Sequence, residues 1–234
     1  EFVTHTGTIG NKWLTVISTG IGTDNIDLVL HELDALVNID FATRLPKAQL
    51  QKLDIIRIGT SGAVQAYIAV DSLLVSSAAL GLDTLMLYYK YQPAEYEKKL
   101  LDGFKSLIPK DSLLTPYIAS ADTSLINQLA YDLPQGITIT APGFYAPQGR
   151  KVRAQPASFE LMDIIQQFHS KSQHITNLEM ETAGIYGLSA ALGHRAISFN
   201  VILANRVTQT FSRQPETIMD QCIKEVLIRL VNIL

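Results

Sequence analysis

The sequence has 234 residues, 47% of them hydrophobic, with a mean hydropathy of +0.16 and a net charge of -3, and this suits one α/β domain. The small charge, without blocks of like charge, gives no reason to expect nucleic acid or an anionic membrane as a partner, and no apolar run predicts a membrane span. The one cysteine, Cys222, excludes an intrachain disulfide framework, so we expect packing for its side chain and a cytoplasmic setting for the protein.

The first elements form a strand-glycine-helix unit. An apolar, β-branched run predicts a buried strand over residues 13–19, which the glycines of residues 20–22 end. Apolar side chains recur at three- and four-residue steps over residues 26–37 and predict a helix. Such a unit places helix amides beside the carboxyl end of the strand, where ligands bind in open α/β sheets. We interpret residues 41–52 as a loop or a short helical insertion.

A second apolar strand carries Arg57 and runs into a small-residue turn over residues 59–62. Gly59 and Gly62 let the backbone approach a ligand, and successive amides in such a turn can form a nest for phosphate. Arg57 adds a planar fork of donors that matches phosphate oxygens. The alternative is a strand that ends in a tight turn, with Arg57 salt-bridged at the sheet edge.

Strands and helices alternate along the rest of the chain, which is typical of a largely parallel sheet. We predict strands over residues 73–78, 117–121, 137–140 and 196–204. We predict helices over residues 94–107, 122–131 and 158–168, and after Pro215. Residues 85–91 read as a strand or an aromatic loop.

Residues 142–155 interrupt the alternation with prolines and glycines around an aromatic and two polar side chains. Phe144 offers a flat face, Gln148 has a donor and an acceptor, and Arg150 presents a fork of donors. Together they can read a heterocycle that carries alternating carbonyl and N–H groups. The alternative is a surface turn with a half-buried aromatic and a solvated arginine.

Residues 177–184 predict the start of another helix, capped by Asn177. Glu179 and Glu181 in the first turn are favourable with the helix dipole, so a purely structural role is one reading. On a helix they would lie about 200 degrees apart, so one points inward if the other faces solvent. An inward carboxylate needs donors, and vicinal sugar hydroxyls supply two.

Residues 57–62, 144–150 and 177–181 together resemble the nucleoside phosphorylase-I family, with the uridine phosphorylase branch closest. The likeness covers nearly the whole chain, and the matching segments follow in the same order from residues 18–22 to the final helix. It implies one nucleoside phosphorylase domain over residues 1–234, with a three-layer α/β/α fold around a mixed, largely parallel sheet. The Phe-x-x-x-Gln-x-Arg pattern is the part that points to a pyrimidine.

The resemblance also implies roles for individual residues. Expected phosphate contacts are Arg57, Gly59 and Thr60. Expected ribose contacts are Thr60, Glu179, Met180 and Glu181. Expected base contacts are Phe144, Gln148 and Arg150, with Leu203 and Ala204 as an apolar wall. Asn205 and Arg206 stand where purine-cleaving relatives place an aspartate, which weighs against purine chemistry.

The implied reaction is phosphorolysis of uridine, with deoxyuridine and thymidine as further substrates, to uracil and the sugar 1-phosphate in pyrimidine salvage. Arg57 would position phosphate, while Gln148 and Arg150 would stabilise the charge on the departing base. Three alternatives stay open: a purine nucleoside phosphorylase, a phosphate-independent nucleosidase, and a non-catalytic nucleoside-binding protein.

The resemblance implies no cofactor and no metal in the site, with inorganic phosphate as co-substrate. Relatives assemble as homodimers or as hexamers of dimers, and some hold a monovalent cation between subunits, where Glu1 and Ile21 stand here. Asn25 differs from the serine of the ion-binding relative. Family members carry an N-terminal strand and a Gly-Asp-Pro-x-Arg phosphate loop upstream of the first printed residue, so we expect these residues to be part of a longer chain.

Overall fold

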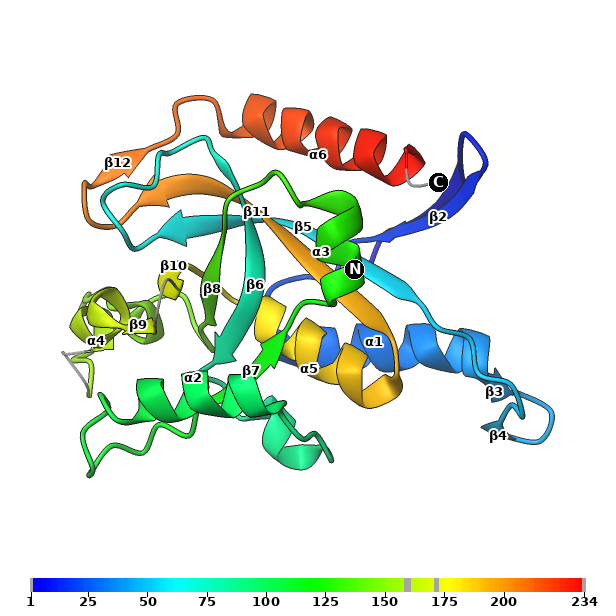
Figure 1. Ribbon diagram of the computed structural model, residues 1–234, viewed down its shortest axis with the longest axis horizontal. Helices are drawn as coiled ribbons and strands as arrows, with labels where there is room; N and C mark the ends of the chain where they lie inside the picture. Colours follow the sequence, from blue (N-terminus) through cyan, green and yellow to red (C-terminus); the bar gives the residue numbers. More distant parts are fainter. Residues whose placement is uncertain (1, 158–160, 171–172, 233–234) are drawn as a thin grey trace.

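The computed structural model describes residues 2–157, 161–170 and 173–232 (Figure 1). Its central sheet has the strand order β12-β11-β5-β10-β8-β6-β7. The strands are β5 (Asp54–Ala63), β6 (Leu73–Gly81), β7 (Tyr117–Ser120), β8 (Gln135–Thr140), β10 (Gln173–Glu179), β11 (Arg195–Asn205) and β12 (Thr210–Phe211), with β9 (His169–Ser170) paired to β10. Parallel pairs join β11 to β5, β10 to β8 and β6 to β8, and antiparallel pairs join the other neighbours, so the predicted mixed sheet is confirmed.

Helices cover both faces of this sheet, which confirms the three-layer α/β/α fold. They are α1 (Thr23–Asn38), α2 (Glu95–Lys105), α3 (Thr123–Leu129), α4 (Leu161–Gln167), α5 (Thr182–Leu192) and α6 (Pro215–Val231). Buried side chains of α3 and α6 pack on one face, against β11 and the start of β6. Those of α1 and α5 pack together on another, while α2 and α4 enclose a third cluster. Cys222 lies in the cluster under α6, as expected.

The strands β11, β5, β10, β8 and β6 close into a ring, because β6 pairs with β8 and also with β11. Phe199 lies opposite Val75 where the ring closes. A closed ring leaves no free edge between these strands and gives them a shared interior. That interior holds the polar side chains that lead to the site.

The strand predicted over residues 13–19 is present, but it is not buried. The segment forms β2 (Lys12–Ile17), which pairs antiparallel with β1 (Thr4–Ile9) in a hairpin outside the central sheet. Trp13 is 77% exposed and Val16 is 61% exposed, so apolar composition does not report burial here. Of the two structures expected for residues 41–52, the loop is present and the helical insertion is not. Within it, β4 (Leu45–Pro46) pairs with β3 (Ile39–Asp40) in a short hairpin.

Two predicted boundaries near the site are also wrong. Residues 59–62 are not a turn, because β5 continues to Ala63 alongside β11. Asn177 does not cap a helix, because it lies inside β10, and α5 begins only at Thr182. Residues 85–91 contain the 3-10 helix η1 (Leu85–Tyr88) and not a strand.

The remaining predicted elements are present with shifted ends. Residues 94–107 contain α2 and residues 122–131 contain α3. Of the helix predicted over residues 158–168, α4 is described and residues 158–160 lie outside the described part. Within the described ranges no helix is both long enough and apolar enough to cross a membrane.

Candidate active site

The guanidinium of Arg57 is the centre of a buried cluster of charges. Its Nη2 lies 2.7 Å from Glu181 Oε2 and 3.1 Å from Glu179 Oε2, and its side chain is 11% exposed. Its Nη1 donates to Asn200 Oδ1 at 3.1 Å. Burial alone would lower the pKa of Arg57, but the two carboxylates outweigh it and raise that pKa. Arg57 is therefore a permanently charged group held by its neighbours.

The guanidinium of Arg57 lies directly against Gly59. A Cβ at position 59 would stand 2.6 Å from Cζ, Nη1 and Nη2 of Arg57, so the guanidinium would have to shift away from its partners. A glycine inside a strand commonly marks such a close approach. The structure thus assigns Gly59 to the placement of Arg57, and β5 is too extended there to form the predicted amide nest. Thr60 is exposed, and its hydroxyl makes no hydrogen bond within the described residues.

Glu179 fixes the backbone that carries the neighbouring ribose candidates. Its Oε2 accepts from the backbone N–H groups of Glu181 at 2.8 Å and Thr182 at 2.9 Å, and its Oε1 accepts from Thr140 Oγ1 at 2.6 Å. It therefore caps the first turn of α5 from two residues before Glu181. Glu179 and Glu181 do not lie on opposite faces of a helix as expected, because Glu179 ends a strand and both carboxylates turn to Arg57.

Glu181 lies where α1, β5 and α5 meet. Its Oε1 accepts from the backbone N–H of Gly22 at 2.8 Å, and its Oε2 accepts from Arg57. Burial raises the pKa of Glu181, the nearby Glu179 raises it further, and Arg57 opposes both effects. Two carboxylate oxygens offer about four acceptor positions, so the carboxylate retains capacity for a sugar diol. Met180 is half-buried between the two glutamates.

The three predicted base contacts lie together. Arg150 Nη1 donates to Gln148 Oε1 at 2.6 Å and also to the carbonyl oxygen of Phe144. Arg150 Cζ lies 3.8 Å from the centroid of the Phe144 ring, a cation–π distance. Gln148 is buried, whereas Phe144 is 54% exposed. The loop thus presents an aromatic face, an amide and a guanidinium within one small cluster.

Arg206 is the residue that sequence reasoning did not assign to the site. Its Nη2 donates to the carbonyl oxygen of Gln148 at 2.7 Å, and its backbone N–H donates to Ala63 at 2.9 Å. Its Cγ and Cδ atoms lie 3.8 Å from the position that a Cβ would take if Gly62 carried one. Its buried Nη1 has no hydrogen-bond partner among the described residues, and burial lowers the pKa of the group. A polar pair directly after a central strand was the available signal.

Arg206 therefore ties the base loop to the end of β5, and β5 connects the two halves of the site. Arg57 and Gly62 are five residues apart on this extended strand, about 16 Å of backbone. β5 therefore carries the charged cluster of Arg57, Glu179 and Glu181 towards its start and contacts the base loop through Arg206 at its end.

The two residues expected as an apolar wall lie in different surroundings. Leu203 packs against the cluster under α6, so the structure does not bring it together with Gln148. Ala204 pairs with Gly62, beside Arg206. At the expected cation position, the carbonyl oxygen of Ile21 accepts from Asn25 Nδ2 at 2.8 Å, and Glu1 lies outside the described residues.

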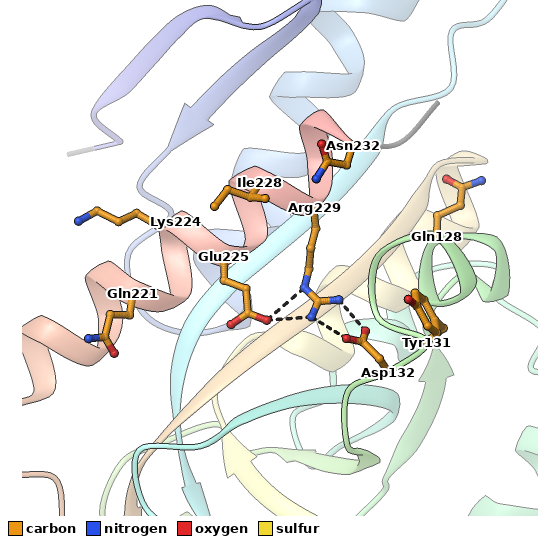
Figure 2. Close-up of a pocket in the computed structure, with 9 residues that line it drawn as sticks. All are labelled: Gln128, Tyr131, Asp132, Gln221, Lys224, Glu225, Ile228, Arg229 and Asn232. Atoms are coloured by element: carbon orange, nitrogen blue, oxygen red, sulfur yellow. Dashed lines mark hydrogen bonds and ion pairs between the residues drawn. The ribbon is translucent and has the colours of Figure 1, made fainter.

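A hollow of about 680 Å³ between α3 and α6 is separate from this site. Figure 2 shows that Arg229 in this hollow points to Asp132 and Glu225. The shortest distances are 2.6 Å from Arg229 Nη1 to Asp132 Oδ1 and 2.8 Å from Nη2 to Glu225 Oε1. The arginine is already paired with two carboxylates, so the hollow is a poor anion site, and none of the predicted site residues lines it.

Comparison with known proteins places the chain in a family. A uridine phosphorylase from Thermococcus kodakarensis is 29% identical over 92% of this chain and 66% of its own length, so the chain spans slightly less than two thirds of that relative. A DeoD-type purine nucleoside phosphorylase from Colwellia psychrerythraea is 25% identical over 91% of this chain and 74% of its own length.

A solved structure shows the same fold. It is a nucleoside phosphorylase from Trypanosoma brucei, described as showing uridine phosphorylase activity, which superposes with a TM-score of 0.86 at 26% identity and covers 97% of this chain and 82% of its own. The sequence model of the phosphorylase superfamily matches residues 1–231. The chain belongs to the phosphorylase superfamily.

Proposed function

We propose that the protein is a pentosyltransferase that splits uridine, and also deoxyuridine or thymidine, with inorganic phosphate in pyrimidine salvage. One observation carries the choice of a pyrimidine: Gln148, Arg150 and Arg206 are joined by hydrogen bonds into one polar cluster beside Phe144. The names of the uridine phosphorylase relative and of the T. brucei structure support the same reading.

The base end of the site would stabilise the leaving group. As the bond from C1′ to the ring nitrogen breaks, its electron pair moves onto the uracil, and negative charge develops on the carbonyl oxygens. Arg150 and Arg206 supply positive charge there, Arg206 through an Nη1 that the described residues leave without a hydrogen bond, and Gln148 supplies an amide. Removing one such donor typically costs about 100- to 1,000-fold in rate.

The sugar and phosphate end would hold the two reacting groups. Glu181 would accept from the 2′ and 3′ hydroxyls, and Arg57 would hold a phosphate oxygen while another oxygen forms the bond to C1′ on the face opposite the base. The departing uracil anion then takes up a proton. Because Arg57 contacts Glu181 at 2.7 Å, one pair of side chains would position both substrates.

The proposal is tested by uridine cleavage in the natural protein with and without inorganic phosphate. We expect cleavage that depends on phosphate and yields the sugar 1-phosphate. Equal turnover without phosphate would favour a nucleosidase, and faster cleavage of inosine would favour a purine enzyme. Uracil binding by calorimetry with no turnover of any nucleoside would favour a non-catalytic binding protein.

Arg150→Ala is the residue-level test of the pyrimidine assignment. We expect uridine turnover to fall about 100-fold or more with an unchanged melting temperature, because Arg150 is assigned to the ligand and not to the core. Uridine kinetics equal to the wild type would remove the assignment. Lys12→Ala, on the outlying β1–β2 hairpin, is a matched control for loss of a basic side chain.

We further propose a cytoplasmic homodimer or hexamer of dimers, with no cofactor other than the phosphate co-substrate. Support comes from the resemblance and from the membership of the superfamily. Sedimentation equilibrium would measure the assembly, and a monomer at micromolar concentration would contradict it. A dependence of activity on K⁺ or Na⁺ would indicate the interfacial cation.

A further inference from the structure

Inside the ring of strands runs a chain of buried polar side chains, which we call the polar belt. Each strand of the ring contributes one member, in the order in which the strands pair: Asn200 on β11, Ser76 on β6, Thr138 on β8, Asn177 on β10 and Ser61 on β5. All are at most 7% exposed. Arg57 donates into the first member, so the belt begins at the charged end of the site.

The first links of the belt leave Asn200 only one orientation. Its Oδ1 accepts from Arg57 at 3.1 Å and its Nδ2 donates to Ser76 Oγ at 2.8 Å. Ser76 and Thr138 are 2.6 Å apart, and Thr138 donates to Asn177 Oδ1 at 2.9 Å, so the proton between the two hydroxyls belongs to Ser76. If the amide of Asn200 were flipped, its Nδ2 would face Nη1 of Arg57, and two donors would oppose each other.

The remaining links return to β5. Asn177 Nδ2 donates to Ser61 Oγ at 2.6 Å, and Ser61 donates to the carbonyl oxygen of Leu178 at 3.1 Å. Every bond from Arg57 to Leu178 therefore runs in the same direction. Chains of hydrogen bonds with one direction strengthen one another in a low-dielectric interior. The belt holds the side chain of Asn200 through Nδ2, while Oδ1 of the same amide accepts from Arg57.

We propose that Asn200 is the positioning residue of Arg57. The inference deepens the proposed function and rests on it. Glu181 is expected to turn part of its capacity to the sugar, and Glu179 is engaged by backbone N–H groups. Asn200 is fully buried, and its Nδ2 is engaged by Ser76 within the belt. It therefore holds Nη1 of Arg57, more closely than Ser198 Oγ at 3.4 Å, while the carboxylate side of the cluster rearranges.

A general role in stability is the alternative, because any buried polar network stiffens a core. The two roles differ in what they affect. Loss of stability affects both substrates alike, whereas a misplaced Arg57 affects phosphate first. A misplacement of about 1 Å in such a group can cost about 100-fold.

The test compares Asn200→Ala with Asn38→Ala. Asn38 is also a buried asparagine with hydrogen bonds through both side-chain atoms, but its partners are Asp34 and Gln51 at the end of α1. For each natural-length variant we would measure KM for phosphate, KM for uridine, the melting temperature and a crystal structure. Ser76→Ala provides a milder variant, which keeps Asn200 and removes the acceptor of its Nδ2 together with the hydrogen bond from Ser76 to Thr138.

We expect Asn200→Ala to raise KM for phosphate about 10- to 100-fold, to change KM for uridine less than about threefold, and to displace the guanidinium of Arg57 in the crystal. Ser76→Ala should raise KM for phosphate by a smaller factor. If Asn200→Ala does not fold, Ser76→Ala becomes the variant that tests the positioning role. Asn38→Ala should lower the melting temperature and leave both KM values unchanged.

Two results would overturn the inference: equal rises of both KM values, or an unmoved guanidinium of Arg57 in a crystal of Asn200→Ala. If the wild type shows no phosphate-dependent cleavage, the proposed function fails. The crystal comparison still decides the positioning role, because a displaced guanidinium supports it and an unmoved one refutes it.

Discussion

Gly59→Ala is the substitution for which the structure gives a worked magnitude. The new Cβ would stand 2.6 Å from three guanidinium atoms of Arg57, whereas ordinary contacts begin at 3.4 Å, so the group must move by about 0.8 Å. Its bonds to Glu181 and Asn200 would lengthen together. A shift of that size in a substrate-positioning group costs up to about 100-fold, so we expect kcat/KM for phosphate to fall about 30- to 100-fold, or about 2–3 kcal/mol.

The assay is phosphorolysis of uridine followed by absorbance at varied phosphate concentration. Gly62→Ala is the matched control, because it makes the same change on the same strand and its Cβ would meet its nearest atoms at 3.8 Å. We expect wild-type phosphate kinetics from Gly62→Ala. Wild-type phosphate kinetics in Gly59→Ala, or an equal loss in both variants, would refute the reasoning.

Three further substitutions separate the parts of the site. Glu179→Gln removes a charge that raises the pKa of Glu181, so the acid limb of kcat/KM for uridine should move to lower pH, and a limb that stays in place or moves up would contradict this account. Glu181→Gln should weaken the binding of uridine about 10- to 100-fold and leave the binding of free uracil unchanged. An equal loss of affinity for both ligands would exclude a ribose role for Glu181. Arg206→Met should release the carbonyl of Gln148 and weaken base binding about 10-fold, with KM for phosphate as the quantity that must not change.

The sequence was sufficient for the fold class. Hydrophobic periodicity located α1 and α6, because each has an apolar stripe. The start of α5 was instead expected from a capping side chain at Asn177, and the helix begins at Thr182. Arg57 is ion-paired, which was part of the alternative to a phosphate site, and Gln148 lies beside Arg150 in one loop. The ligands that these side chains bind stay a prediction. Local pattern was informative wherever a segment's own periodicity decided its structure.

The errors near the site share one physical cause. Asn177 looked like a helix cap because a polar residue in a buried strand is unfavourable by itself, and its partners on β5 and β8 are far away in sequence. Gly59 looked like a turn because the close approach of Arg57 from two residues earlier cannot be seen in a propensity. In both cases a side-chain contact decides the local structure, and the pattern of residue types along the chain does not reveal that contact.

The outlying β1–β2 hairpin determines what optical spectroscopy can observe in this protein. Trp13 is the only tryptophan in the sequence, and it projects into water from the hairpin. Its fluorescence should therefore have the red-shifted maximum of a hydrated indole and should not respond to ligands bound near Arg57. A blue shift on concentration alone would signal that a second molecule covers the hairpin, which makes this indole a reporter of assembly and leaves ligand titrations to the ultraviolet absorbance of the base.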